Sequence, residues 1–240
     1  MPVDQVRLVA AHAWDVAGAA RTGCATAFVA RPGKVLDPHF ERVFGDARVR
    51  QAWFGQLIQS ALVATVTGAY RPFGEIALAA LQMTAAQAGL ELADADRDAI
   101  AAQLRRLPAH PEVPGALRRL QEAGFRLAAL TNSTEEVAGA QLEHAGLIDR
   151  FEQVLSADTV RRLKPAPEPY RHAAERLGVP VDQVRLVAAH AWDLAGAARA
   201  GCATAFVARP GKVLDPLVAP PEVVGADLGE VADRILAVDG

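Results

Sequence analysis

The chain has 240 residues, of which 51% are hydrophobic and 22% charged, a composition typical of a globular protein that buries a large core. A formal net charge of −3 provides no basic field for nucleic acid, and no stretch approaches the roughly 18 apolar residues of a membrane-spanning helix. Cys24 and Cys202 form no framework of paired cysteines, and the N-terminus lacks the pattern of a secretory signal. We therefore expect a soluble, cytoplasmic protein with neither nucleic acid nor a membrane as partner.

One segment occurs twice. Residues 2–38 recur as residues 180–216, and the copies differ only where Val16 replaces Leu194 and Thr22 replaces Ala200. Solenoid repeats have periods of roughly 20–50 residues and stack on their neighbours. Two copies at opposite ends of a chain are therefore not a solenoid. The near-identity indicates recent copying of the segment onto the other terminus, or a wrongly assembled sequence.

Each copy predicts a β-α-β unit. The apolar run Val-Arg-Leu-Val-Ala-Ala suits a buried strand, and small residues at helical spacing follow Asp193 in the second copy. A Gly-Cys pair then ends the helix before the strand Ala-Thr-Ala-Phe-Val. Such units build parallel sheets.

Residues 39–107 differ in character, because apolar residues recur there at helical spacing and no clear strand appears. We expect helices at Val49–Thr67, Gly74–Ala88 and Asp94–Leu107. From Pro108 onward, predicted strands and helices alternate, which favours a doubly wound α/β fold with a parallel sheet. The expected elements are Glu112–Ala123, Arg126–Leu130, Glu136–His144, Phe151–Ser156, Glu168–Leu177, the second copy and Leu228–Val238.

Three groups of polar residues fall where predicted strands end: Thr131-Asn132-Ser133, Lys164, and the turn His190–Asp193. Ligands of doubly wound sheets bind at the carboxyl ends of the strands, so these groups are candidate site residues. Each also has a simpler interpretation. The first could cap a helix, Lys164 could be a surface lysine in a turn, and Asp193 could be a helix cap.

The motifs LTNS, RRLKPAPEPY and VAAHAWDLAGAARAG resemble, in this order, the last three motifs of the haloacid dehalogenase superfamily. The form Ala-Trp-Asp-x-x-Gly-Ala is similar to the (S)-2-haloacid dehalogenase branch, and the resemblance runs from about His39 to the C-terminus. It implies a core domain of residues 1–38 plus 108–240 and a small helical cap domain of residues 39–107.

The resemblance implies a reaction and roles for five residues. Dehalogenases of the branch displace halide from a small 2-haloacid with an aspartate, and water then hydrolyses the ester. By motif position, Lys164 would hold the nucleophile, Asp193 would position the hydrolytic water and the lysine, and Thr131 and Asn132 would bind the substrate carboxylate. Tyr170 matches the aromatic hydroxyl of the K-P-x-x-x-x-Y pattern. A homodimer and the absence of a cofactor are also implied.

Further candidates would contact the substrate. Arg50, near the start of the first long cap helix, is our candidate for receiving the halide. Trp53 and Phe54 could line the pocket, although their helical spacing equally fits the core of the cap. His190 stands where the branch often has asparagine, so its role is open.

The same region separates dehalogenase from phosphatase. Superfamily phosphatases bind Mg²⁺ through a D-x-D motif and further acidic residues after the fourth strand, and a hard cation needs several oxygen ligands. Only Asp193 is acidic at that strand end in this chain. We therefore expect no metal, and a phosphatase is the less favoured alternative.

The nucleophile motif of the family, F-D-x-x-G-T after the first strand, is missing. The first copy stands in its place, and its Asp15, in a D-x-x-G sequence, is a weak candidate that a helix cap explains equally well. Two near-identical units would also compete for one place in the sheet, a source of frustration. The alternative function is therefore an inactive relative that binds small carboxylates.

Overall fold

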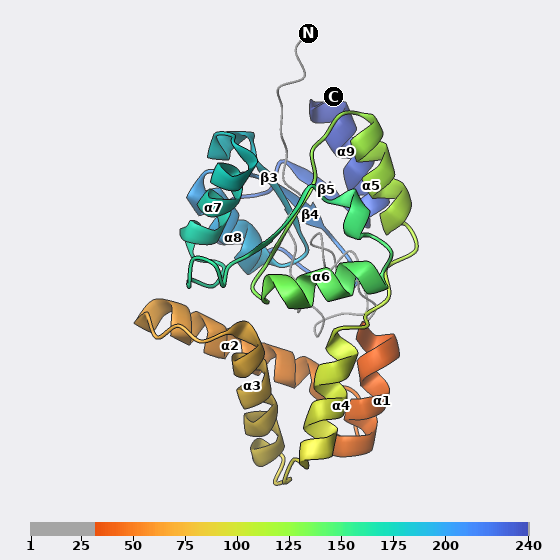
Figure 1. Cartoon of the computed structure of the whole chain (residues 1–240), viewed down its shortest axis with the longest axis vertical. Helices are drawn as coiled ribbons and strands as arrows, with labels where there is room; N and C mark the ends of the chain where they lie inside the picture. Colours follow the sequence, from red (N-terminus) through yellow and green to blue (C-terminus); the bar gives the residue numbers. More distant parts are fainter. Residues whose placement is uncertain (1–31, 240) are drawn as a thin grey trace.

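The computed structural model describes residues 32–239. They form a helical cap and an α/β core (Figure 1). The cap lies at the bottom of Figure 1 and the core, with the C-terminus, lies above it. The cap consists of α1 (Pro32–Phe44), α2 (Val49–Thr67), α3 (Phe73–Gln87) and α4 (Asp94–Leu104).

The core alternates strands and helices along the chain, which confirms the doubly wound α/β prediction. Its helices are α5 (Val113–Glu122), α6 (Glu135–His144), α7 (Pro167–Leu177), α8 (Ala191–Ala200) and α9 (Leu228–Asp239), with 3₁₀ turns η1 (Ile148–Arg150) and η2 (Val181–Gln183). Its strands are β1 (Ala128–Thr131), β2 (Gln153–Ser156), β3 (Arg185–Ala188), β4 (Ala203–Val207) and β5 (Val223–Gly225).

The described strands form two parallel ladders, β1–β2 and β3–β4–β5. Leu130 is level with Leu155 in the first ladder, and Val187 is level with Ala205 in the second. Because all pairs are parallel, each ladder has its carboxyl ends on one edge, which is where the polar motifs were expected.

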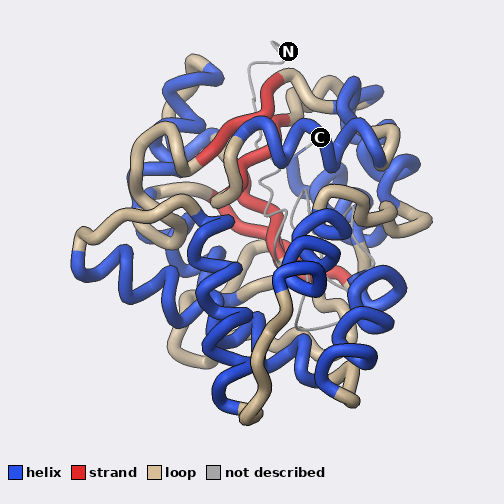
Figure 2. The backbone as a smooth tube through the Cα atoms, turned by 60° about the horizontal axis from the view of Figure 1, so that its bottom comes forward, coloured by secondary structure: helices blue, strands red, loops and turns tan. Residues whose placement is uncertain are grey.

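Side chains alternate between the two faces of these strands, as the pleat of a strand requires. Ala129 and Val187 belong to a hydrophobic cluster with α5 and α9, whereas Leu130 and Leu186 belong to a second cluster with α7 and α8. β1 and β3 therefore share both clusters although they lie in different ladders. The tube view shows the strands surrounded by helices (Figure 2).

The second copy folds as the predicted β-α-β unit, from η2 through β3, α8 and β4. α8 ends at Gly201, whose φ of 107° lies in the region that glycine tolerates best. Arg185, on β3 and buried, pairs with Glu222 and with Asp239 at the end of α9. These contacts fasten the unit to the residue before β5 and to the end of α9.

The cap has its own hydrophobic cluster, which includes Leu36, Phe40, Trp53 and Phe73. Leu36 is a residue of the duplicated sequence, and α1 was not predicted as a helix. One member of the cluster, Leu163, comes from the core. The predicted helices at 49–67, 74–88 and 94–107 are confirmed to within a few residues.

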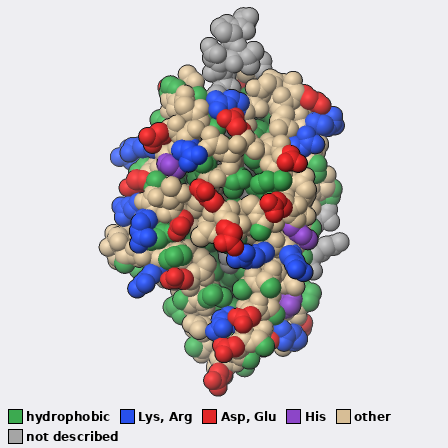
Figure 3. All heavy atoms as spheres, viewed as in Figure 1, with side chains coloured by type: hydrophobic (Ala, Val, Ile, Leu, Met, Phe, Trp, Pro, Cys, Tyr) green, Lys and Arg blue, Asp and Glu red, His purple; other side chains and the backbone are tan. Residues whose placement is uncertain are grey.

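Basic and acidic side chains are interspersed over the face of the molecule drawn in Figure 3. Within residues 32–239, no helix has the length and apolarity that crossing a bilayer would require.

Candidate active site

Lys164 is buried at the carboxyl ends of both ladders, so its interpretation as a surface lysine is wrong. Its Nζ donates to Asp193 Oδ2 at 2.7 Å and to the backbone oxygen of Leu130, on β1, at 3.3 Å. Neither charged side chain is exposed at all. Because Asp193 follows β3, this lysine joins the ends of the two ladders and neutralises a carboxylate that would be costly to bury alone.

Asp193 is the third residue of α8, and it does not cap that helix. The residue preceding the helix is His190, which makes no capping bond through its side chain. The second carboxylate oxygen, Oδ1, accepts a hydrogen bond from the Tyr170 hydroxyl at 2.6 Å. The negative charge of Asp193 is therefore held by an ammonium, a phenol and the N-terminal end of a helix.

Asn132 fixes the backbone of Lys164 from both sides. Its Oδ1 accepts from Lys164 N at 2.7 Å, and its Nδ2 donates to Lys164 O at 3.3 Å. Thr131 Oγ1 accepts from Ser133 N at 3.0 Å. The N-cap of α6 is instead Thr134, whose hydroxyl accepts from Val137 N, so the helix-cap interpretation of residues 131–133 is wrong.

The structure places Trp53 inside the cap. Its indole nitrogen donates to Ala77 O at 3.0 Å, and its ring lies 5.4 Å from that of Phe40. Arg50, one turn earlier on α2, is also buried and pairs with Asp37 of α1. Both residues thus tie α2 to other cap helices.

Phe54 lies between the cap and the core. Its ring centroid is 5.7 Å from that of His190, and Lys212 Nζ is 5.9 Å from the centroid of Phe54. The His190 ring also contacts Trp192 at 5.7 Å and hydrogen-bonds to Lys212 through Nε2. Lys212, which the sequence did not single out, therefore places a positive charge beside the turn that carries Asp193.

Comparisons with known proteins identify the family of the chain. The family model described as haloacid dehalogenase-like hydrolase matches residues 5–201. The chain belongs to the haloacid dehalogenase-like hydrolases. An (S)-2-haloacid dehalogenase of Pseudomonas sp. (strain YL) is 31% identical over 71% of this chain and 73% of its own length. A haloacetate dehalogenase of Moraxella sp. (strain B) is 30% identical over 71% of this chain and 76% of its own length.

Solved structures support the same branch. An L-2-haloacid dehalogenase superposes with a TM-score of 0.85 at 26% identity, covering 96% of this chain and 99% of the other. The enzyme of Xanthobacter autotrophicus with chloropropionic acid covalently bound has a TM-score of 0.83 at 23% identity, over 98% and 100% of the two chains. The latter likeness concerns the fold alone.

The dehalogenase-like motif also contains a residue that sequence reasoning passed over. A Cβ on Gly196 would lie 2.5 Å from Pro165 O and 2.7 Å from the Tyr170 hydroxyl. Only glycine lets α8 approach the Lys164 loop this closely. The spacing Asp-x-x-Gly was the available signal.

Cys202 is a free cysteine buried in the hydrophobic cluster of α7 and α8. Burial, and to a smaller extent the charge of Asp193, raises the pKa of its thiol to about 12. Asp15, the weak candidate for the nucleophile, lies outside the described residues. Among residues 32–239, no group of three or more His, Cys, Asp and Glu side chains is arranged to hold a metal ion.

Proposed function

We propose that this chain hydrolyses the carbon–halogen bond of small 2-haloacids through an aspartyl ester. The observation that carries the proposal is the buried Lys164–Asp193 pair, which joins the carboxyl ends of β1 and β3 and is braced by Tyr170. The dehalogenases among the relatives support the substrate class.

In the proposed first step, a carboxylate oxygen attacks the α-carbon, and the halide leaves with the bonding electrons. The Lys164 ammonium would hold the attacking carboxylate in line. Water then adds to the ester carbonyl, releasing the 2-hydroxyacid, one proton and the original carboxylate. Asp193, fixed by Lys164 and Tyr170, would orient that water.

The substrate contacts are proposals as well. Thr131 and Asn132 lie at the end of β1, where a substrate carboxylate would bind. The contacts of the Asn132 amide with Lys164 support a second role for Asn132, which is to hold the lysine in place. Arg50 would receive the halide, and Phe54 and His190 would close the pocket. Trp53 would act indirectly, since its indole packs within the cap.

The alternative is a protein that binds small carboxylates without turning them over. The missing F-D-x-x-G-T motif favours it, because ester formation requires a carboxylate beside Lys164. Under this alternative, Lys164 and Thr131 bind an anion and no covalent step follows.

The deciding experiment measures halide release from racemic 2-chloropropionate, using protein whose intact mass matches the sequence. We expect release from the unsubstituted chain and none from Lys164→Ala. If Asp15→Asn also abolishes release, Asp15 is the nucleophile. No release, together with calorimetric binding of 2-chloropropionate, would establish the carboxylate binder. If the protein instead releases phosphate from phosphate esters, and a chelator abolishes this release, it is a phosphatase.

We also propose that the protein is a cytoplasmic homodimer. Sedimentation velocity at micromolar concentration tests the assembly, and a monomer would contradict it.

A further inference from the structure

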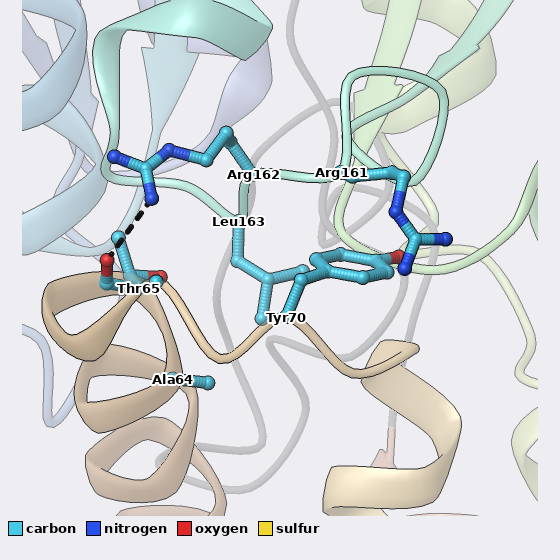
Figure 4. Close-up of a pocket in the computed structure, with 7 residues that line it drawn as sticks. Ala64, Thr65, Tyr70, Arg161, Arg162 and Leu163 are labelled. Atoms are coloured by element: carbon cyan, nitrogen blue, oxygen red, sulfur yellow. Dashed lines mark hydrogen bonds between the residues drawn. The ribbon is translucent and has the colours of Figure 1, made fainter.

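The loop between α2 and α3 of the cap docks on the segment between β2 and α7 of the core (Figure 4). We call residues 65–70 of the cap and 158–163 of the core the latch. The Tyr70 hydroxyl donates to Asp158 Oδ1, and the guanidinium of Arg161 lies 4.7 Å from the centroid of the Tyr70 ring. One cap side chain therefore contacts two residues of the core segment, by a charge-assisted hydrogen bond and a cation–π contact.

Arg162 extends the latch to α7. Its guanidinium donates to Thr65 O, near the C-terminal end of α2, at 3.4 Å and pairs with Glu168 of α7 at 3.3 Å. A cation is favourable at the C-terminal end of a helix. Because α7 carries Tyr170, Arg162 links the cap to the helix that braces Asp193.

Leu163 connects the latch to the catalytic lysine. It is 1% exposed and belongs to the hydrophobic cluster of the cap, although it is a residue of the core segment. The next residue is Lys164, whose backbone Asn132 holds from the core side. The lysine is thus fixed between a core contact on one side and a cap contact on the other.

The backbone of the segment points to the same role. Arg161 is the one non-glycine residue of the described chain with a positive φ, at 49°. Such a conformation persists where surrounding contacts hold it, and it clusters at functional sites. The Tyr70 hydroxyl is protonated at neutral pH and can donate, and burial, followed by the hydrogen bond to Asp158, raises its pKa further.

We propose that Tyr70 is a positioning residue, which acts through Asp158 and the 158–163 segment to hold Lys164 in place while the cap covers the site. This inference deepens the proposed function and rests on it for its catalytic consequence. Its structural part, the ordering of the Lys164 segment by a cap side chain, can be tested without turnover.

The test is hydrogen–deuterium exchange of the full chain with Tyr70→Phe, with Asp158→Ala, which removes the acceptor oxygen, and with the double variant. Tyr70→Phe keeps the ring over Arg161 and removes only the donor. We expect amides in 158–164 to exchange about tenfold faster in each single variant than in the unsubstituted protein. The double variant should exchange no faster than the single variants, because all three remove the same interaction. Unchanged exchange of these amides would overturn the proposal.

A matched control breaks another contact between cap and core. Arg105, after α4, pairs with Glu136 of α6 across an exposed surface. Glu136→Ala, which removes the acceptor of this contact, should leave exchange in 158–164 unchanged. If it accelerates exchange there as much as Tyr70→Phe does, general loosening of the cap explains the effect and the specific role of Tyr70 is wrong.

Kinetics separate this proposal from the proposed function. If the chain releases halide, Tyr70→Phe should lower kcat about tenfold with little change in KM, since the lysine and not substrate binding is displaced. An unchanged kcat would overturn the positioning role. If the unsubstituted chain releases no halide, the proposed function fails, and the exchange comparison alone decides the role of Tyr70.

Discussion

The heptapeptide Pro-Gly-Lys-Val-Leu-Asp-Pro occurs at residues 32–38 and again at 210–216, with two different conformations. The first occurrence begins α1, and Pro38 lies inside that helix. The second is a turn and an irregular loop after β4. Identical local propensity therefore leads to a helix in one place and to a loop in the other.

The surroundings of the leucine in each heptapeptide, Leu36 and Leu214, explain why one copy is helical and the other is not. Leu36 is fully buried with Phe40 in the cap cluster, whereas Leu214 is only partly buried at the edge of the α7–α8 cluster. The flanking sequence acts in the same direction. Helix-compatible residues up to Phe44 follow the first occurrence, and Pro220-Pro221 follow the second, where proline opposes a helix. Packing thus overrides propensity, a weak prior.

The two leucines give the largest contrast. Leu36→Ala should lower the free energy of unfolding by about 2–5 kcal/mol, because it leaves a cavity in the cap, whereas Leu214→Ala should cost about 1 kcal/mol or less. Urea denaturation of both variants measures the difference. Equal losses would mean that burial does not distinguish the two copies.

Replacing the aspartate of each heptapeptide should give a smaller difference in stability. Asp37 pairs with the buried guanidinium of Arg50, while Asp215 is exposed and accepts a hydrogen bond from Leu217 N. Asp37→Asn should cost about 1–2 kcal/mol of stability, because a buried charge loses a charged partner. Asp215→Asn keeps an acceptor oxygen and should cost less than about 0.5 kcal/mol. Thermal unfolding of both variants tests the order, and a reversal would refute our account of α1.

The prolines should respond with opposite signs. Pro38→Ala adds an N–H inside α1 and should stabilise the protein by about 1 kcal/mol. Pro216→Ala only frees the unfolded chain and should destabilise by about 0.5 kcal/mol. Chemical denaturation measures both. The same sign at both positions would argue against a helix at residues 32–44.

The smallest effect concerns the cysteine of the second copy. With its pKa raised from 9.0 to about 12, Cys202 stays protonated at pH 8 and should be alkylated at least about tenfold more slowly than in urea. Since the unfolded thiol ionises first, its contribution to stability falls as pH rises between about 9 and 12. Mass spectrometry resolves the two cysteine peptides, because one contains Thr22 and the other Ala200. Fast alkylation of Cys202 in the folded protein would contradict its burial.

Much of the site could be predicted from the sequence, because polar residues that follow parallel strands meet at one edge of the sheet. Asn132, Lys164 and Asp193 come together as the three strand-end motifs implied, and Tyr170 joins them as the family resemblance implied. Adjacent apolar residues on one helix were harder to separate. The sequence could not tell whether Trp53 and Phe54 line the pocket or pack in the cap. Only the structure shows that Phe54 faces His190 in the core.

Other features had no sequence signal. Tyr70 and Asp158 are 88 positions apart, and neither belongs to a motif. α1 could not be distinguished from the loop at residues 210–216, since the heptapeptide is the same. Contacts between distant segments depend on the assembled fold, which local patterns do not encode.

Leu163 has a consequence for engineering. Caps invite exchange between related enzymes as separate modules, to change which acids are accepted. In this protein the hydrophobic interior of the cap includes a side chain that the core supplies, directly before the lysine. A graft cut at the ends of the cap helices would leave a hole in the transplanted cap and a loose lysine beneath it. A transplant should therefore carry residues 158–163 from the same donor.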